Sequence, residues 1–338
     1  MSRTFNRYTP FSAITTAVLF ALLTTGAWAS VPNNTADMIQ DGDDNVATIV
    51  QAPDPDGIRL EASINQAGDY NSASIMQSEQ SAYNIASIDQ SGDGNSADIS
   101  QSWESVYNHA TVDQSGDYNT ASVYQTDNSE GNYASVDQSG YGNIADVSQS
   151  YGAEYNYATV NQSGDDNTAY ISQDGSLYNA AYVDQSGHSN YATVTQLEDS
   201  DSNNATIDQS GDGNSAMVSQ YYHSFYNQAS VNQSGDYNYA TIEQNYDSAD
   251  NVATVDQSGN DNSAEIFQND YAQYNEATVN QSGDYNSATI LQNESMDNVA
   301  SVGQSGDGNL AFVNMVGHEY DAVSVMQSGN GNVAQYNP

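Results

Sequence analysis

Cysteine and lysine are absent from this 338-residue chain, and its three basic residues are Arg3, Arg7 and Arg59. Without cysteine, neither disulfide bonds nor thiolate chemistry can contribute to the fold or to a reaction. Against these three arginines the chain has 44 aspartates and glutamates, which gives a formal net charge of −41 at pH 7. A chain with so few cations cannot neutralise phosphates, so the composition excludes nucleic acid as a partner.

Long hydrophobic runs are also rare, and only residues 13–23 approach one. Arg3 and Arg7 precede this run, and residues 27–29, Ala-Trp-Ala, follow it as a small-x-small cleavage site. This order is typical of a secretory signal peptide over residues 1–29, with a mature chain that starts at Ser30. The run is shorter than the roughly 20 residues that span a bilayer, so we expect export and no integral membrane segment.

Proline is missing from residue 56 to residue 337, as a chain of fully hydrogen-bonded strands requires. A repeat fills this stretch instead. Residues 89–101, "DQSGDGNSADISQ", contain the skeleton Gln-x-Gly-x-x-Asn-x-Ala-x-Ile-x-Gln, which recurs in thirteen copies, mostly 24 residues apart. A period of this length indicates a solenoid and not a set of independent domains.

Each copy divides into two similar halves, such as residues 84–90 and 95–101, both of the form Asn-x-Ala-x-Ile-x-Gln. Fixed residues two apart share one face of a β-strand, and the Ser, Thr, Asp, Tyr and Glu between them suit a solvent face. We predict an all-β solenoid of stacked strand-turn-strand repeats, with two facing parallel sheets and amyloid-like cross-β stacking. It covers residues 58–338, after an N-terminal segment, 30–57, that holds a degenerate first copy.

One repeat buries too few apolar side chains to offset the entropy of ordering 24 residues, so the copies must stack. In a stack, each side-chain amide can donate a hydrogen bond to the copy on one side and accept one from the copy on the other, so inward Asn and Gln need not be buried without partners. The predicted ladder glutamines are Gln66, Gln90, Gln114, Gln138, Gln162, Gln185, Gln209, Gln233, Gln257, Gln281, Gln304 and Gln327. The predicted ladder asparagines are Asn71, Asn95, Asn119, Asn143, Asn167, Asn190, Asn214, Asn238, Asn262, Asn286 and Asn309. The turn glycines, placed for positive φ or close backbone approach, are Gly68, Gly92, Gly116, Gly140, Gly164, Gly187, Gly211, Gly235, Gly259, Gly283 and Gly306.

The pattern of residues 84–101, Asn-x5-Gln-x-Gly-x-x-Asn-x-Ala-x3-Gln, resembles the curlin repeat of curli subunits. The resemblance covers residues 34–337 and implies an extracellular functional amyloid, a structural subunit of fimbrium-like fibres in biofilm matrix and surface adhesion. It further implies a Gram-negative-type bacterium, polymerisation with copies of itself, a nucleating curlin subunit and outer-membrane curli secretion machinery as partners.

Two features depart from the major curli subunits. No glycine-rich stretch precedes the repeats, and the number of copies is larger. The final copies lack the basic residues associated with the minor, nucleating subunit, which favours a major, polymer-forming role.

Aspartate follows the turn glycine in nine copies, and two interpretations stay open. As gatekeepers, stacked carboxylates would delay assembly until low pH or divalent cations reduce their repulsion. Alternatively, Asp is a good turn residue on a solvated edge. These residues are Asp43, Asp69, Asp93, Asp117, Asp165, Asp212, Asp236, Asp284 and Asp307. Half-repeats of 11 and usually 13 residues do not fit the nine-residue calcium β-roll, so no specific metal site is expected.

Tyrosine often precedes the half-repeat asparagine, as at Tyr83 and Tyr107, where it would form exposed rows for adhesion or pack between coils. The sequence has no constellation for nucleophilic, acid-base or metal catalysis, so we expect no enzyme and no cofactor. Alternatives to the major fibre subunit are a nucleating subunit, or a soluble capped solenoid that acts as a surface adhesin or cation-binding module.

Overall fold

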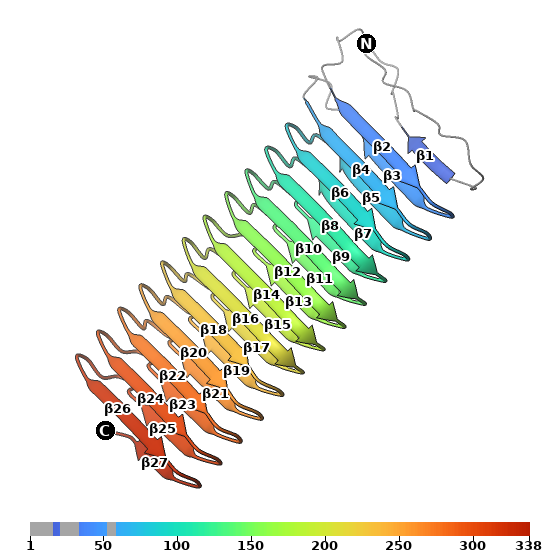
Figure 1. The fold of residues 1–338 in the computed structure, drawn as a ribbon. Helices are drawn as coiled ribbons and strands as arrows, with labels where there is room; N and C mark the ends of the chain where they lie inside the picture. The colour runs from blue at the N-terminus through green and yellow to red at the C-terminus, as the bar shows by residue number, and fades with distance from the viewer. Residues whose placement is uncertain (1–15, 21–33, 53–58) are drawn as a thin grey trace.

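The computed structural model describes residues 16–20, 34–52 and 59–338, and every regular element in these ranges is a β-strand. The strands form two sheets, one of 14 and one of 13 parallel strands. Figure 1 shows the strands stacked side by side along one straight axis, in sequence order from the N-terminal to the C-terminal end. The predicted all-β solenoid with two facing parallel sheets is confirmed.

Odd-numbered and even-numbered strands belong to different sheets. The odd-numbered sheet contains β1 (Thr16–Phe20), β3 (Val46–Gln51), β5 (Ser72–Ser78), β7 (Ser96–Ser102), β9 (Thr120–Tyr124), β11 (Ile144–Ser148), β13 (Thr168–Ser172), β15 (Tyr191–Thr195), β17 (Ser215–Ser219), β19 (Tyr239–Glu243), β21 (Ser263–Phe267), β23 (Ser287–Leu291), β25 (Leu310–Asn314) and β27 (Val333–Tyr336). The even-numbered sheet contains β2 (Thr35–Asp41), β4 (Glu61–Ala67), β6 (Ile85–Ser91), β8 (His109–Asp117), β10 (Tyr133–Tyr141), β12 (Tyr157–Asp165), β14 (Ala180–His188), β16 (Asn204–Asp212), β18 (Gln228–Ser234), β20 (Val252–Ser258), β22 (Glu276–Ser282), β24 (Val299–Ser305) and β26 (Ala322–Ser328). Each repeat is therefore one even strand, a short turn and one odd strand.

Neighbouring strands pair in the register that places like residues opposite one another. Ala158 of β12 lies opposite Ala134 of β10 and Ala181 of β14, so each alanine stacks on alanine. The degenerate first copy forms β2 and β3, inside the predicted 30–57 segment. Most of the predicted signal peptide lies outside the described residues, but β1 falls within it and pairs in parallel with β3.

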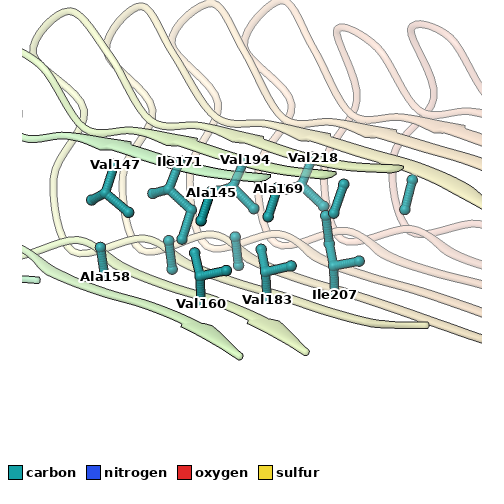
Figure 2. Close-up of a cluster of buried hydrophobic side chains, with 14 of the residues drawn as sticks. Ala145, Val147, Ala158, Val160, Ala169, Ile171, Val183, Val194, Ile207 and Val218 are labelled. Atoms are coloured by element: carbon teal, nitrogen blue, oxygen red, sulfur yellow. The ribbon is translucent and has the colours of Figure 1, made fainter. Parts of the chain in front are cut away.

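The core is a narrow seam of alanine and β-branched side chains between the sheets. Figure 2 shows Val147, Ile171 and Val194 from the odd-numbered sheet pointing toward Val160 and Val183 of the even-numbered sheet. All five side chains are buried. Since each repeat adds only small apolar side chains, the seam gains its stability from its length.

The short turn depends on glycine for two reasons. Gly164 has φ of +112°, a left-handed conformation that disfavours a side chain. A Cβ added there would also lie 2.2 Å from the backbone oxygen of Gly187 in the next repeat. Stacking at the strand spacing therefore excludes any side chain at this position.

The longer turn between repeats uses left-handed residues that are not glycine. Trp103 and Glu104 both have φ of +59°, and Tyr107 has φ of +58°. Such residues cost roughly 1–2 kcal/mol each in isolation. The stack holds them in place: Glu104 N–H donates to the Glu79 carbonyl at 2.9 Å and Tyr107 N–H to the Ala82 carbonyl at 3.0 Å.

Replacing Gly164 with alanine should destabilise the fold more than replacing Gly152 does. Both glycines have positive φ, but a Cβ at Gly152 meets nothing within 4 Å. Gly152→Ala should lower the free energy of unfolding by about 1–2 kcal/mol through the left-handed conformation alone. Gly164→Ala should lower it by about 1–3 kcal/mol more, because the repeats must separate to admit the methyl group. Guanidinium denaturation followed by circular dichroism measures both, and equal losses would contradict the close approach.

Candidate functional site

The glutamines of the first half-repeat form an unbroken ladder along the solenoid. The Nε2 of each donates to the Oε1 of its counterpart in the next repeat at 2.7–2.9 Å. This first glutamine ladder consists of Gln40 and the twelve predicted ladder glutamines, Gln66 to Gln327. Every bond points toward the C-terminal end, so the ladder gives the molecule a polarity.

The same amides connect the two sheets. Gln162 on β12 uses its second N–H to donate to the backbone oxygen of Ile144 on β11 at 2.9 Å, and Gln185 donates to that of Thr168 at 3.1 Å. Gln162 therefore uses both donors and its oxygen, as a buried amide requires.

The predicted ladder asparagines bond to the main chain as well as to each other. The Oδ1 of Asn143 accepts from the backbone N–H of Asn167 at 3.0 Å and from its Nδ2 at 3.1 Å. The Nδ2 of Asn143 donates to the carbonyl of Gly164 at 2.8 Å. The bond from main-chain N–H to Oδ1 links every member from Asn71 to Asn309. Each asparagine thus fixes the strand register and the short turn together.

Sequence reasoning did not single out the equivalent residues of the other half-repeats. A second glutamine ladder, with bonds of 2.8–2.9 Å, runs through Gln51, Gln77, Gln101, Gln125, Gln149, Gln173, Gln196, Gln220, Gln244, Gln268 and Gln292. A second asparagine series runs from Asn84 to Asn298. The likeness of the two half-repeats was the signal that could have identified both.

The second glutamine ladder stops before the last repeat. Its next position is Met315, whose sulfur lies 3.9 Å from the Nε2 of Gln292. A thioether is a weak acceptor and has no N–H to donate, so the relay ends there. The two ladders therefore differ at the C-terminal end, where only the first continues.

The turn aspartates lie exposed along one edge and make specific contacts. The Oδ1 of Asp69 accepts from the backbone N–H of Asp43 at 2.7 Å, and the Oδ1 of Asp93 accepts from that of Asp69 at 2.8 Å. These bonds offset part of the repulsion that sequence reasoning expected between neighbouring carboxylates. His188 occupies one position of this column, between Asp165 at 3.5 Å and Asp212 at 3.1 Å.

Carboxylates also stack on the outer faces of the sheets. Asp113 lies opposite Asp89 and Asp137 in register. Partial burial, and then the charges of Asp137 and Asp89, raise the pKa of Asp113. Burial followed by the charge of Asp208 raises the pKa of Asp184 in the same way. The stack thus makes ionisation of these aspartates less favourable than in a free chain.

The tyrosines before the half-repeat asparagines form pairs and not a continuous row. Tyr83 and Tyr107 stack with ring centroids 4.8 Å apart, and Tyr155 and Tyr178 stack at 5.3 Å. Gly131 separates the two pairs. All four rings are exposed.

A comparison with protein families gives an independent match to this pattern. The family model of the curlin associated repeat matches residues 153–175, 200–221 and 273–306. These segments include β12 with β13, β16 with β17, and β22 to β24, and ladder residues lie on or directly beside each of these strands. The chain carries curlin associated repeats. No curated protein matches the sequence.

Other kinds of site have little support in this curlin-repeat protein. In the described ranges, no group of three His, Cys, Asp or Glu side chains is placed to hold a metal ion. Over the same ranges, no helix has the length and apolarity to cross a membrane. Curlin repeats are a structural family and not an enzyme family.

An interior ladder glutamine should matter far more to this curlin-repeat protein than an exposed one on the same strand. Gln233 and Gln228 both lie on β18, the first buried in the ladder and the second exposed. Gln233→Met leaves the neighbouring donor and acceptor buried and unpaired, which should cost about 2–5 kcal/mol. Gln228→Met should change the free energy of unfolding by less than about 0.5 kcal/mol. Denaturation of the two variants side by side tests this, and similar losses would show that the ladder bond is not the cause.

Acidification should stabilise the fold as pH falls from neutrality toward about pH 4, near the ordinary Asp pKa. Asp98, Asp113, Asp146 and Asp184 have raised pKa values when folded, mainly through burial. In that window the folded chain binds more protons than the unfolded chain, so these groups lower stability as pH rises. Asp113→Asn should raise stability at pH 7 and flatten the dependence. Denaturation between pH 4 and 7 measures the slope, which must be shallower in the variant than in the parent.

Proposed function

We propose that this chain is the major structural subunit of an extracellular curli-type amyloid fibre, which grows by head-to-tail stacking of whole solenoids. The main support is the first glutamine ladder. All its hydrogen bonds point the same way, so one end of the molecule offers an acceptor and the other end offers a donor. The curlin associated repeats support the same function, because that family implies self-assembly into fibres. Biofilm matrix and surface adhesion are the roles such a fibre would serve.

At the N-terminal end the ladder lacks a donor. Gln40 donates to Gln66 at 2.7 Å, but its own Oε1 is buried and has no hydrogen-bond partner among the described residues. A buried acceptor without a partner costs about 1–3 kcal/mol, and a donor from outside the molecule would recover it.

At the C-terminal end the ladder has a donor to spare. Gln327 accepts from Gln304 at 2.8 Å and donates one N–H to the carbonyl of Leu310 at 3.0 Å. An amide nitrogen carries two hydrogens, so the second remains for an acceptor beyond β26. A second copy stacked in register would place Gln40 Oε1 there and continue the ladder.

The proposed signal peptide fits this assembly. Strand β1 covers the edge of β3, and cleavage after Ala29 would remove it together with the leader. The exported chain would then present both β2 and β3 to an incoming β26 and β27. Parallel in-register addition is the geometry of cross-β growth. Export through curli secretion machinery and initiation by a nucleating curlin subunit belong to the same proposal.

The turn aspartates act in this proposal as gatekeepers of assembly. Like charges about 4.8 Å apart repel by roughly 0.9 kcal/mol per pair in water, so each pair of neighbouring turn aspartates within the chain opposes the stacking of its repeats. Protonation or divalent cations would reduce that repulsion and shorten the lag. Assembly that responds to neither pH nor Ca²⁺ would refute the gatekeeper role.

Seeded growth of residues 30–338, followed by thioflavin-T and fibre diffraction, tests the proposal. We expect a lag that seeds abolish and reflections near about 4.7 and 10 Å. Gln40→Leu and Gln327→Leu should slow elongation while leaving the monomer folded, whereas the interior variant Gln185→Leu should destabilise the monomer itself. A β-rich monomer that ignores seeds would instead favour the soluble, capped adhesin.

A further inference from the structure

One exposed tyrosine has a carboxylate positioned to take its phenolic proton. The Tyr155 hydroxyl donates to Glu130 Oε1 at 3.0 Å, and the Tyr155 backbone N–H donates to the Glu130 carbonyl at 2.8 Å. A Cβ on Gly131 would lie 2.7 Å from the Tyr155 ring, so this glycine lets the ring fold back over the preceding repeat. Two hydrogen bonds and a missing side chain thus hold the phenol against Glu130.

A second tyrosine lies on the other side of the Tyr155 ring. Tyr178 in the next repeat stacks on it with centroids 5.3 Å apart and planes within 9°. Both rings are about half exposed, at 46% and 59%. A diffusing oxidant can therefore reach a face-to-face pair of phenols whose spacing the strand stack fixes.

The arrangement differs from that of an otherwise similar pair. Tyr83 and Tyr107 stack more closely, at 4.8 Å and 1°, yet within the described residues no carboxylate accepts a hydrogen bond from either phenol. Hydrogen bonding to Glu130, followed by its charge, raises the pKa of Tyr155. A phenol is protonated at neutral pH, so its proton must leave together with an electron, and Glu130 is placed to accept the proton of Tyr155.

We propose that Glu130, Tyr155 and Tyr178 form a site of oxidative tyrosine cross-linking, at which a peroxide-driven haem peroxidase produces a dityrosine bond between neighbouring repeats. Glu130 accepts the phenolic proton as Tyr155 gives up an electron, and Tyr178 supplies the second phenoxyl radical.

The reaction balances with one peroxide. Each tyrosine loses one electron and one proton, and hydrogen peroxide takes up two of each to give two waters. The two radicals join through ring carbons ortho to the oxygens. The hydrogens on those carbons then move to the oxygens and restore both phenols, so the chain loses two hydrogen atoms in all.

The product would be a covalent link between residues 23 positions apart in sequence. A chain without cysteine has no disulfide to serve this purpose, although export would permit one. The bond would close a loop in the unfolded chain and so resist unfolding.

The test oxidises the chain from Ser30 to Pro338 with a haem peroxidase and less than one equivalent of hydrogen peroxide. Digestion after Asp and Glu, followed by mass spectrometry, locates each dityrosine by its loss of two hydrogens. The Tyr155–Tyr178 link should form on the order of tenfold faster than the Tyr83–Tyr107 link. This ratio is smaller than a positioned proton acceptor usually gives, because the site is exposed to water.

Two variants separate proton acceptance from packing. Glu130→Gln keeps the shape and should reduce the Tyr155–Tyr178 link to the rate of the Tyr83–Tyr107 pair, which should itself not change. Tyr155→Phe should abolish the link. Circular dichroism checks that both variants fold. Equal rates for the two pairs in the parent chain, or a Glu130→Gln variant that cross-links as fast as the parent, would overturn the proposal.

Discussion

The hydrogen bond from one glutamine amide to the same amide in the next repeat is the interaction on which the other features depend. It is short, directional and buried, and it forms only when identical residues meet at the strand spacing. Alanine over alanine, the narrow apolar seam and the constant length of the short turns all keep identical glutamines opposite one another. Gly164 follows from the same constraint, since any side chain there would force the repeats apart.

Direction is the second consequence of the ladder. A stack of symmetric apolar side chains could be extended equally well from either end, but an amide has a donor end and an acceptor end. The first ladder therefore distinguishes Gln40 from Gln327, and Met315 makes the two sheets unequal at the C-terminal end. The polarity of the molecule comes from side chains, because parallel strands in both sheets present the same backbone groups at each step.

The period of the sequence was sufficient to predict the strands, the two sheets and the glutamines that meet, because each is a property of spacing alone. The bond from Gln162 to the Ile144 carbonyl could not be predicted, since it depends on how far one sheet is displaced relative to the other. Likewise, the contact between Tyr155 and Glu130 depends on a left-handed backbone at a tyrosine, a conformation that residue type disfavours and that only the completed stack enforces.

The outward-facing carboxylates make the solenoid a polyelectrolyte. Thirteen repeats carry all 44 acidic residues, and at about 4.8 Å per repeat this amounts to one negative charge per roughly 1.4 Å of axis. Double-stranded DNA carries one per about 1.7 Å and condenses counterions around itself. A rod of this charge density holds its own atmosphere of cations, so neighbouring rods repel sideways while the uncharged ladders remain free to meet end to end.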